Sequence, residues 1–234
     1  MKAKRQAFQF KQFSIRQDQA AMKVGTDGVL VGAWTDCSKA KRILDIGCGT
    51  GLLCLMLAQR CQAQLTGIEI EPEATLQAQQ NVAECTWSER IKILEGDFTS
   101  FESEEQYDLI VCNPPYFNAN RNRDKREQAR QNISLPYPLL FEKVAEHLSP
   151  KGSFSLISPA DRETELLTLG ENQGLFPKRL LKVRGNHQAK IKRLLIEFTF
   201  EEKACEEKSL IIEKERHQYT EDYANLLREY LLIF

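Results

Sequence analysis

The sequence has little of what metal centres, disulfide frameworks and membrane spans require. The three histidines, His147, His187 and His217, show no metal-ligand spacing. The seven cysteines form no CxxC pair and no Cys/His cluster, and their number is odd. This pattern favours buried free thiols in a reducing compartment, so we expect a cytoplasmic protein without a metal site.

Long apolar runs and an excess of one charge are also missing. Residues 1–5, MKAKR, are basic like the start of a signal peptide, but no apolar segment follows and no stretch reaches the length of a membrane span. The net charge is −1, so any attraction to a polyanion must come from uneven charge distribution. Among 234 residues, 42% are apolar, which predicts a folded chain with a sizeable core.

What is present is an alternation of two periodicities. Buried strands are predicted at 42–47, 64–70, 91–97, 107–113 and 153–159, and helices at 51–60, 73–85, 137–148 and 219–232. This spacing predicts βαβ units, a mostly parallel sheet and helices on both faces. Residues 176–184 and 193–200 predict a closing antiparallel hairpin. We find no repeat or linker, and expect one domain over 1–234, with a leader (1–41), a core (42–200) and an extension (201–234).

The segment DIGCGTG (45–51) joins the first predicted strand to the first helix. Gly47, Gly49 and Gly51 allow a tight turn and a close approach of a ligand to the backbone. The following helix directs its free N–H groups toward the same space. The G-x-G-x-G spacing differs from that of dinucleotide-binding turns and lacks the Lys-Ser/Thr of a P-loop, which disfavours NAD and ATP.

Two acids end the next two predicted strands. Glu69 could accept hydrogen bonds from both hydroxyls of a ribose, and Asp97 could accept from the amino group of an adenine. Acids also end strands simply because strands end at the surface. The glycine turn followed by two strand-end acids in order is more specific than any one of them alone.

The segment VCNPPYFNAN (111–120) follows the fourth strand. Two adjacent prolines remove two N–H donors and leave rigid carbonyl acceptors, and Asn113 before them is held extended. The side-chain oxygen of Asn113 and the carbonyl of Pro114 could accept both hydrogens of an exocyclic amine, while Tyr116 could stack on the base. A rigid turn that only ends a strand is the alternative interpretation.

Taken together, D-I-G-x-G-x-G, the two acids and N-P-P-Y resemble the signature of S-adenosylmethionine-dependent methyltransferases that act on amino groups. The resemblance implies a Rossmann-like methyltransferase fold, with a seven-stranded, mostly parallel sheet, one antiparallel strand and helices on both faces. It implies that Gly47, Gly49 and Gly51 hold the methionine part of the cofactor, with Glu69 on the ribose and Asp97 on the adenine. Asp45, Phe98 and Asn113 are expected beside the cofactor as well.

The N-terminal run VGTDGVLVGAW (24–34) extends the resemblance over nearly the whole chain. It is similar to the leader of bacterial enzymes that methylate N6 of the adenine beside the anticodon of valine tRNA. The resemblance therefore implies a tRNA partner and a catalytic set of Asn113, Pro114 and Tyr116. It also places Thr26 and Asp27 near the cofactor, although both could simply cap a helix over GVLVGAW.

Basic residues are concentrated in two stretches. Residues 121–130 contain five basic residues and two acids, and residues 178–193 contain seven basic residues and no acid. Such stretches bind phosphate backbones, although most charge runs are solvated surface. We expect tRNA to contact both, and the protein to act as a monomer. Phe8, Phe10 and Phe13 could contact RNA, but their alternation is more typical of a strand face on the core.

Three other functions fit parts of the pattern. Methylation of a guanine in rRNA shares much of the signature. Methylation of a protein glutamine shares N-P-P-Y, but those enzymes carry a helical domain before the cofactor domain, and only about 42 residues precede ILDIG here. A non-catalytic RNA-binding protein with this fold would need neither DIGCGTG nor NPPY.

Overall fold

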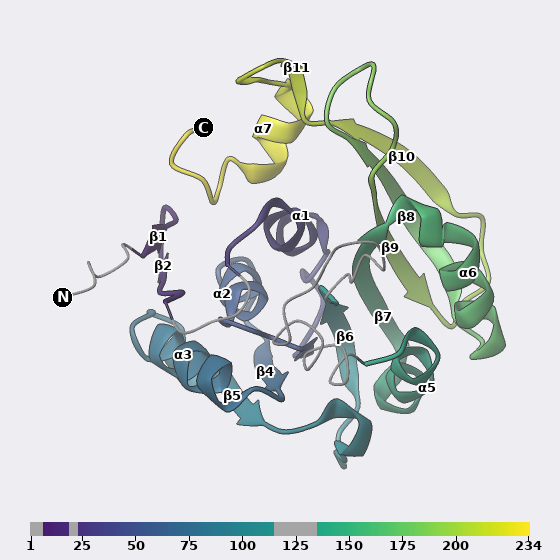
Figure 1. Cartoon of the computed structure of the whole chain (residues 1–234). Helices are drawn as coiled ribbons and strands as arrows, with labels where there is room; N and C mark the ends of the chain where they lie inside the picture. Colours follow the sequence, from purple (N-terminus) through teal and green to yellow (C-terminus); the bar gives the residue numbers. More distant parts are fainter. Residues whose placement is uncertain (1–6, 19–22, 115–134) are drawn as a thin grey trace, which may run out of the picture.

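A single large sheet forms the centre of the protein, whose computed structural model describes residues 7–18, 23–114 and 135–234. The sheet has eight strands in the order β10-β8-β9-β7-β6-β3-β4-β5 (Figure 1). These are β3 (Arg42–Ile46), β4 (Gln64–Glu69), β5 (Ile91–Glu95), β6 (Tyr107–Cys112), β7 (Leu148–Pro159), β8 (Phe176–Arg184), β9 (Arg193–Thr199) and β10 (Glu206–Ile211).

One strand of this sheet, β9, runs against the others, because it pairs antiparallel with both β7 and β8. The predicted hairpin and the single antiparallel strand are thus confirmed. The predicted count of seven strands is wrong, since β10 adds an eighth beside β8. An edge strand needs few apolar residues, and only Leu210 of β10 is buried in the core. Because the sequence of β10 is mostly charged, it lacks the apolar alternation by which strands are predicted.

Helices cover both faces of the sheet, as predicted. One face carries α1 (Thr26–Trp34), α2 (Leu52–Ala58), α3 (Pro72–Ala83) and α7 (Glu221–Leu227), and the other carries α5 (Tyr137–His147) and α6 (Glu163–Asn172). Alternate residues of β6 enter the two cores, with Leu109 and Val111 on the α1 side and Ile110 and Cys112 on the α5 side. This period of two is what a strand buried on both faces requires.

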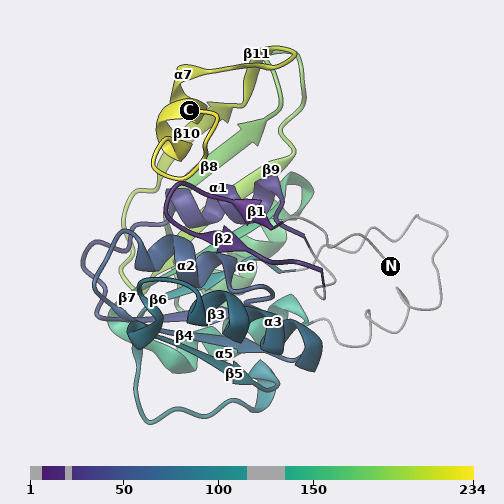
Figure 2. The same cartoon turned by 90° about the vertical axis from the view of Figure 1, so that its left-hand side faces the viewer.

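A described segment near each end of the chain takes part in one contact, because Phe10 forms an isolated antiparallel bridge with Leu231. β1 (Phe8–Gln9) and β2 (Ser14–Ile15) form a small antiparallel pair. Phe10 and Phe13 are buried and their ring centroids lie 4.5 Å apart, so these two phenylalanines pack on the core. β11 (Glu213–Glu215) and β12 (Gln218–Tyr219) precede α7, whose N-cap is Thr220. Figure 2 shows β10, β11 and α7 at one end of the molecule and β5 at the other.

Three single-turn 3-10 helices complete the described elements: η1 (Ser88–Arg90), η2 (Phe98–Ser100) and η3 (Ala160–Arg162). The turn η2 matters for the site, because it begins directly after Asp97 and closes the end of β5.

Candidate functional site

The residues that the sequence analysis singles out lie along one edge of the sheet. In space β6, β3, β4 and β5 are consecutive neighbours, and they run parallel to one another. Asn113, the glycine turn, Glu69 and Asp97 stand at the carboxyl ends of these strands, in that order. Three strand spacings separate the outer two, or about 14 Å, which suits an elongated ligand such as a nucleoside joined to an amino acid.

The turn after β3 depends on its glycines. Gly47, Gly49 and Gly51 have φ values of 66°, 56° and 80°, a region that other residues rarely adopt. A Cβ atom added to Gly47 or Gly49 would meet no described atom within 4 Å. The backbone of the turn therefore borders open space, and a ligand can lie directly against it.

The carboxylate of Glu69 holds this turn in place. Its Oε2 accepts a hydrogen bond from the N–H of Gly49 (2.8 Å), and its Oε1 accepts one from the N–H of Glu71 (3.0 Å). The side chain is largely buried, with 8% of the residue exposed. Because a carboxylate oxygen can accept more than one hydrogen bond, both atoms keep capacity for further donors such as vicinal hydroxyls.

Asp45 lies beneath the turn and is buried, with 1% of its surface exposed. Its Oδ2 accepts from the thiol of Cys54 (3.4 Å), and its Oδ1 has no hydrogen-bond partner among the described residues. Burial, together with the Glu69 carboxylate, raises the pKa of Asp45 to about 7. A buried carboxyl oxygen without a partner among the described residues is unusual, and this one lies within the protein beneath the turn.

Beyond the turn, Asp97 and Phe98 close the end of β5. The Oδ1 of Asp97 accepts from the N–H of Thr99 (2.8 Å), while the residue as a whole is exposed. Phe98 is buried, and its ring packs against Phe101 and His147. The ring therefore belongs to the core, and Phe98 can offer a ligand at this edge only its backbone.

Sequence reasoning missed Ile70, which follows Glu69 directly. It is 39% exposed, an uncommon state for isoleucine, and stands between the two acids at the strand ends. A flat apolar ring bound there would cover it. An apolar residue placed directly after a strand-end acid is the signal that could have identified it.

Asn113 and Pro114 occupy the end of β6. Asn113 is half-buried and Pro114 is buried. The amide of Asn113 lies beside α1, since a Cβ atom built on Gly28 would be 3.5 Å from its Nδ2. Tyr116 and the basic stretch 121–130 lie outside the described residues.

The start of α1 borders the same edge. The N-cap of α1 is Gly25, so capping by Thr26 or Asp27, one of the two interpretations from sequence, is wrong. Instead Asp27 accepts a hydrogen bond from Nε of Arg193 (2.8 Å), which links α1 to the first residue of β9. The two cysteines nearest the site, Cys48 and Cys112, are buried, and burial raises the pKa of both thiols.

Four of the seven basic residues in the stretch 178–193 are paired with acids in the structure. Lys178 and Arg179 both bind the carboxylate of Glu197, a side chain only 2% exposed on the neighbouring strand. Lys182 pairs with acids from α6 and β10, and Arg193 pairs with Asp27. Within the described ranges, no acid is paired with the remaining three, which are Arg184, Lys190 and Lys192.

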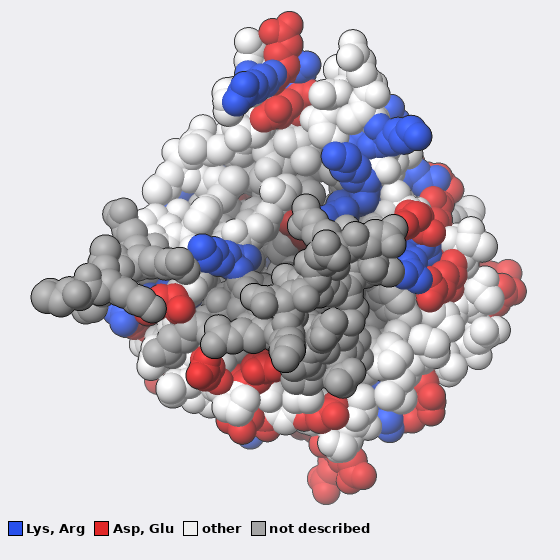
Figure 3. All heavy atoms as spheres, in the orientation of Figure 1, with Lys and Arg blue, Asp and Glu red and all other residues white. Residues whose placement is uncertain are grey.

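These three cations lie at the carboxyl edge of the sheet, where Arg184 ends β8 and the other two precede β9. Figure 3 shows Lys and Arg side chains gathered at the upper right of this view, where Figure 1 places the end of the β8–β9 hairpin. Across the described part of the chain, no group of three His, Cys, Asp or Glu side chains is placed to hold a metal ion. None of the helices described has both the length and the apolar character needed to cross a bilayer.

Comparison with known proteins agrees with this geometry. The model of the methyltransferase small domain family matches residues 24–170, from the approach to α1 through α6. In structure, the chain is similar to a predicted O-methyltransferase of Agrobacterium tumefaciens, with a TM-score of 0.68 over 87% of this chain and 96% of the other. At 19% identity that likeness concerns the fold alone.

Curated relatives are far more similar in sequence. The tRNA1(Val) (adenine(37)-N6)-methyltransferase of Bacteroides fragilis strain YCH46 is 44% identical over 96% of this chain and 97% of its own length. The enzyme of that name in Flavobacterium psychrophilum is 42% identical over 96% and 99%. The chain therefore belongs to the methyltransferase small domain family and, within it, to the family of bacterial tRNA1(Val) (adenine(37)-N6)-methyltransferases.

Proposed function

We propose that this protein methylates the N6 amine of adenine 37 in tRNA1(Val), using S-adenosylmethionine as the methyl donor. The observation that carries the proposal is the position of Asn113 and Pro114 directly beside the glycine turn, on neighbouring strands of one sheet edge. A site for an amine and a site for an elongated cofactor thus share one edge. The protein is proposed to act in the cytoplasm, as a single chain.

The residues at this edge suit the cofactor. Gly47, Gly49 and Gly51 would border its methionine part, where a side chain at Gly47 or Gly49 would occupy open space. Glu69 would accept from the ribose hydroxyls with its remaining lone pairs, and Asp97 from the adenine amine. The backbone of Phe98 and the exposed face of Ile70 would lie against the adenine ring, and the buried Asp45 would act on the cofactor only through the turn above it.

When bound, S-adenosylmethionine supplies a methyl group already activated by a sulfonium, so the protein needs no strong base. The difficulty lies with the amine, whose lone pair is delocalised into the adenine ring. The Asn113 side-chain oxygen and the Pro114 carbonyl would each accept one amine hydrogen and orient the nitrogen for in-line approach. Positioning and fixed dipoles supply the acceleration in such a site.

The base must leave its stack to reach this edge. Tyr116, which follows the two prolines, is proposed to stack on the turned-out adenine, an arrangement common to enzymes that act on bases. Arg184, Lys190 and Lys192, together with residues 121–130, are proposed to contact the phosphates. Their position beside the same sheet edge is the support for the hairpin residues.

The test is nucleoside mass spectrometry of purified valine tRNA from a strain that lacks this protein. We expect N6-methyladenosine to be missing at position 37, and to return when wild-type protein is supplied but not when Asn113→Ala is supplied. Normal N6-methyladenosine at that position in the deletion strain would overturn the proposal. A missing methyl group on an rRNA guanine or a protein glutamine would replace it with one of the other functions.

A further inference from the structure

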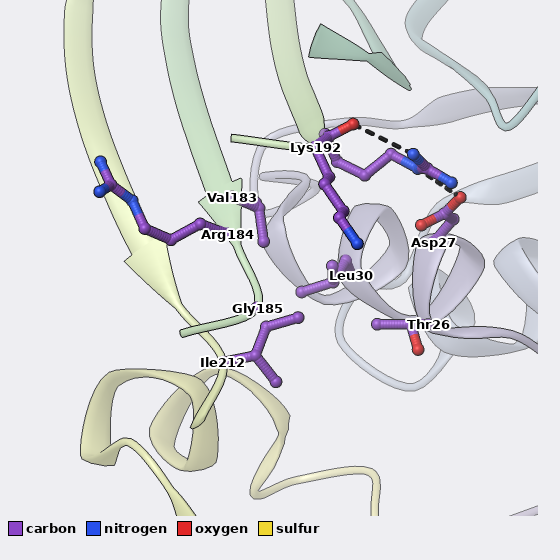
Figure 4. Close-up of a pocket in the computed structure, with 9 residues that line it drawn as sticks. Thr26, Asp27, Leu30, Val183, Arg184, Gly185, Lys192 and Ile212 are labelled. Atoms are coloured by element: carbon purple, nitrogen blue, oxygen red, sulfur yellow. Dashed lines mark hydrogen bonds and ion pairs between the residues drawn. The ribbon is translucent and has the colours of Figure 1, made fainter. Parts of the chain in front are cut away.

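A cavity of about 210 Å³ opens between the start of α1 and the end of the β8–β9 hairpin. Thr26 and Asp27 border it from α1, and Arg184, Lys192 and Arg193 border it from the hairpin (Figure 4). Leu30 and Val183 form part of its floor. The space equals that of about seven water molecules, which is enough for one phosphodiester group.

The charges around this cavity do not cancel. Arg193 is balanced by Asp27, which accepts its Nε–H at 2.8 Å. In Figure 4 the side chain of Lys192 points across the cavity toward α1, while that of Arg184 runs along the rim away from it. No acid in the described ranges pairs with either Lys192 or Arg184, and Nε of Arg184 is buried without a hydrogen-bond partner there.

The first turn of α1 adds hydrogen-bond donors. The nine-residue helix begins at Thr26 after a glycine N-cap that has no side chain to occupy the first N–H groups. Thr26, the first residue of this helix, borders the cavity. A lysine and a helix start that face one cavity form the combination that phosphate groups bind in proteins.

The cavity lies next to the proposed amine site. Gly28 follows Asp27 directly, and a Cβ atom on Gly28 would be 3.5 Å from Nδ2 of Asn113. The sheet register gives the same result, because Arg193 pairs with Pro159 of β7, and β7 neighbours β6 along the carboxyl edge. A group held in the cavity would therefore be separated from an adenine held at Asn113 by the first turn of α1.

We infer that this cavity is a phosphate subsite, which holds a backbone phosphate flanking the target adenine. The inference rests on the proposed function and goes beyond it. It states that Lys192 and the start of α1 position the turned-out nucleotide. Lys192 is the principal charge of the subsite. The Asp27–Arg193 pair fixes α1 against the hairpin, so that the two walls keep their spacing.

The experiment is a double-mutant cycle in which Lys192 is replaced in the protein and single phosphates are replaced in the RNA. The probe is an anticodon stem-loop RNA of valine tRNA, in which single phosphates on either side of adenine 37 are replaced by neutral methylphosphonates. One of these replacements is expected to weaken binding to the wild type about tenfold, the loss typical of a charged hydrogen bond. The same replacement should change binding to Lys192→Ala by less than twofold. Lys192→Ala should also lower the salt slope by about 0.7.

Lys151→Ala is the matched control, because Lys151 is exposed in the segment before Gly152, at the opposite edge of the sheet. It should show the full tenfold effect of the methylphosphonate. If every phosphate replacement weakens Lys192→Ala as much as it weakens the wild type, the subsite is wrong. If the wild-type protein does not methylate adenine 37 of this RNA, the proposed function is wrong, and the subsite is wrong with it. If methylation occurs but the binding results contradict the subsite, only the subsite is wrong, so the two failures are distinguishable.

Discussion

Asp45 makes the stability of the fold depend on pH. Its carboxyl group is buried, one of its oxygens has no partner among the described residues, and its pKa is about 7, well above the ordinary value of 3.8. In the unfolded chain the group ionises near pH 4, while in the fold it stays protonated until about pH 7. Stability therefore falls as the pH rises from 4 to 7, and the loss stays constant above that range.

Asp45→Asn should remove this loss. In the cofactor-free protein we expect the free energy of unfolding to rise by up to about 4 kcal/mol at pH 8 and to stay unchanged near pH 4. Urea unfolding at the two pH values measures the difference. Asp36→Asn should act in the opposite direction at neutral pH, because hydrogen bonds with Ser38 hold the pKa of Asp36 below its usual value. A gain for Asp45→Asn that does not depend on pH would contradict this account.

Gly49 has a positive φ, and it borders the space where the cofactor is proposed to lie. A comparison with a second glycine of positive φ can separate the effects of these two properties. Gly174, in the turn between α6 and β8, has φ 69° and equally open surroundings among the described residues, but it lies at the amino end of a strand and not at the carboxyl ends. Gly49→Ala and Gly174→Ala should each lower stability by roughly 1 kcal/mol, the strain of an alanine at positive φ. Only Gly49→Ala should lose S-adenosylmethionine binding, measured by calorimetry. Equal affinity in both folded variants would remove the glycine turn from the cofactor site.

Asn113→Ala tests the proposed amine site. It removes one acceptor but leaves both prolines, so single-turnover methylation should slow on the order of a hundredfold. RNA affinity, set mainly by phosphates, should change little. Asn186→Ala in the hairpin loop, where the side chain accepts only local N–H groups, is the control. A wild-type rate for Asn113→Ala would show that the amine is oriented by other groups.

At the scale of elements, the β8–β9 hairpin carries two kinds of basic side chain. Some are paired with acids within the fold, and others have no acid partner among the described residues and could bind RNA. The Arg179 guanidinium donates to the buried Glu197 carboxylate (2.8 Å from Nε) and lies 4.4 Å from the ring centre of Trp34. It therefore ties the hairpin to the end of α1. The sequence 178–193 does not show which basic residues are paired with acids. The register of β8 against β9 does show it, because it places Arg179 opposite Glu197.

Arg179→Met should lower the free energy of unfolding by about 3 kcal/mol, since it leaves the Glu197 carboxylate buried with Lys178 alone. RNA affinity should change less than twofold. Arg162→Met is the matched control, because its pair with Glu165 is exposed and such pairs contribute little. Urea unfolding and filter binding measure the two quantities. A large loss of RNA affinity without loss of stability would place Arg179 on the RNA path instead.

Most of the core elements followed from periodicity, because β3 to β7 and their helices are buried and carry regular apolar patterns. The elements that escaped are α6, the edge strand β10 and the β11–β12 pair, whose apolar residues are few. In the site, the strand-end positions of Glu69, Asp97 and Asn113 followed from the same logic. The buried ring of Phe98 and the exposed Ile70 did not, because burial at a strand end depends on which elements pack there.

At the scale of the whole molecule, segments from the two ends of the chain complete one core. Phe10 bridges to Leu231 in antiparallel fashion, and the N–H of Lys11 donates to the carbonyl of Tyr230 (2.8 Å). Tyr230 is itself buried, and its hydroxyl donates to the carbonyl of Met56 in α2 (2.9 Å). One side chain thus joins the C-terminal segment to the helix that follows the glycine turn.

Tyr230→Ala should lower the free energy of unfolding by about 3–5 kcal/mol, the range for loss of a large buried aromatic. The melting temperature should fall by about 6–20 °C for a chain of this size. Tyr230→Phe should lose only about 1 kcal/mol, for one hydrogen bond. Leu232→Ala, at a residue 64% exposed, is the control in thermal unfolding. Equal melting temperatures for all three variants would show that this segment adds nothing to the core.

The pairing of the two chain ends also sets an order of events during synthesis. Lys11 donates from Nζ to the carbonyls of Arg228 and Phe234, residues made 217 and 223 positions later. At 5–20 residues per second, the ribosome needs about 10–40 s to cover that distance. Near the end of this interval the strands already made can pair while Phe10 still lacks its C-terminal partner Leu231. The nascent chain therefore carries an exposed aromatic segment that chaperones can bind until its last turn is made.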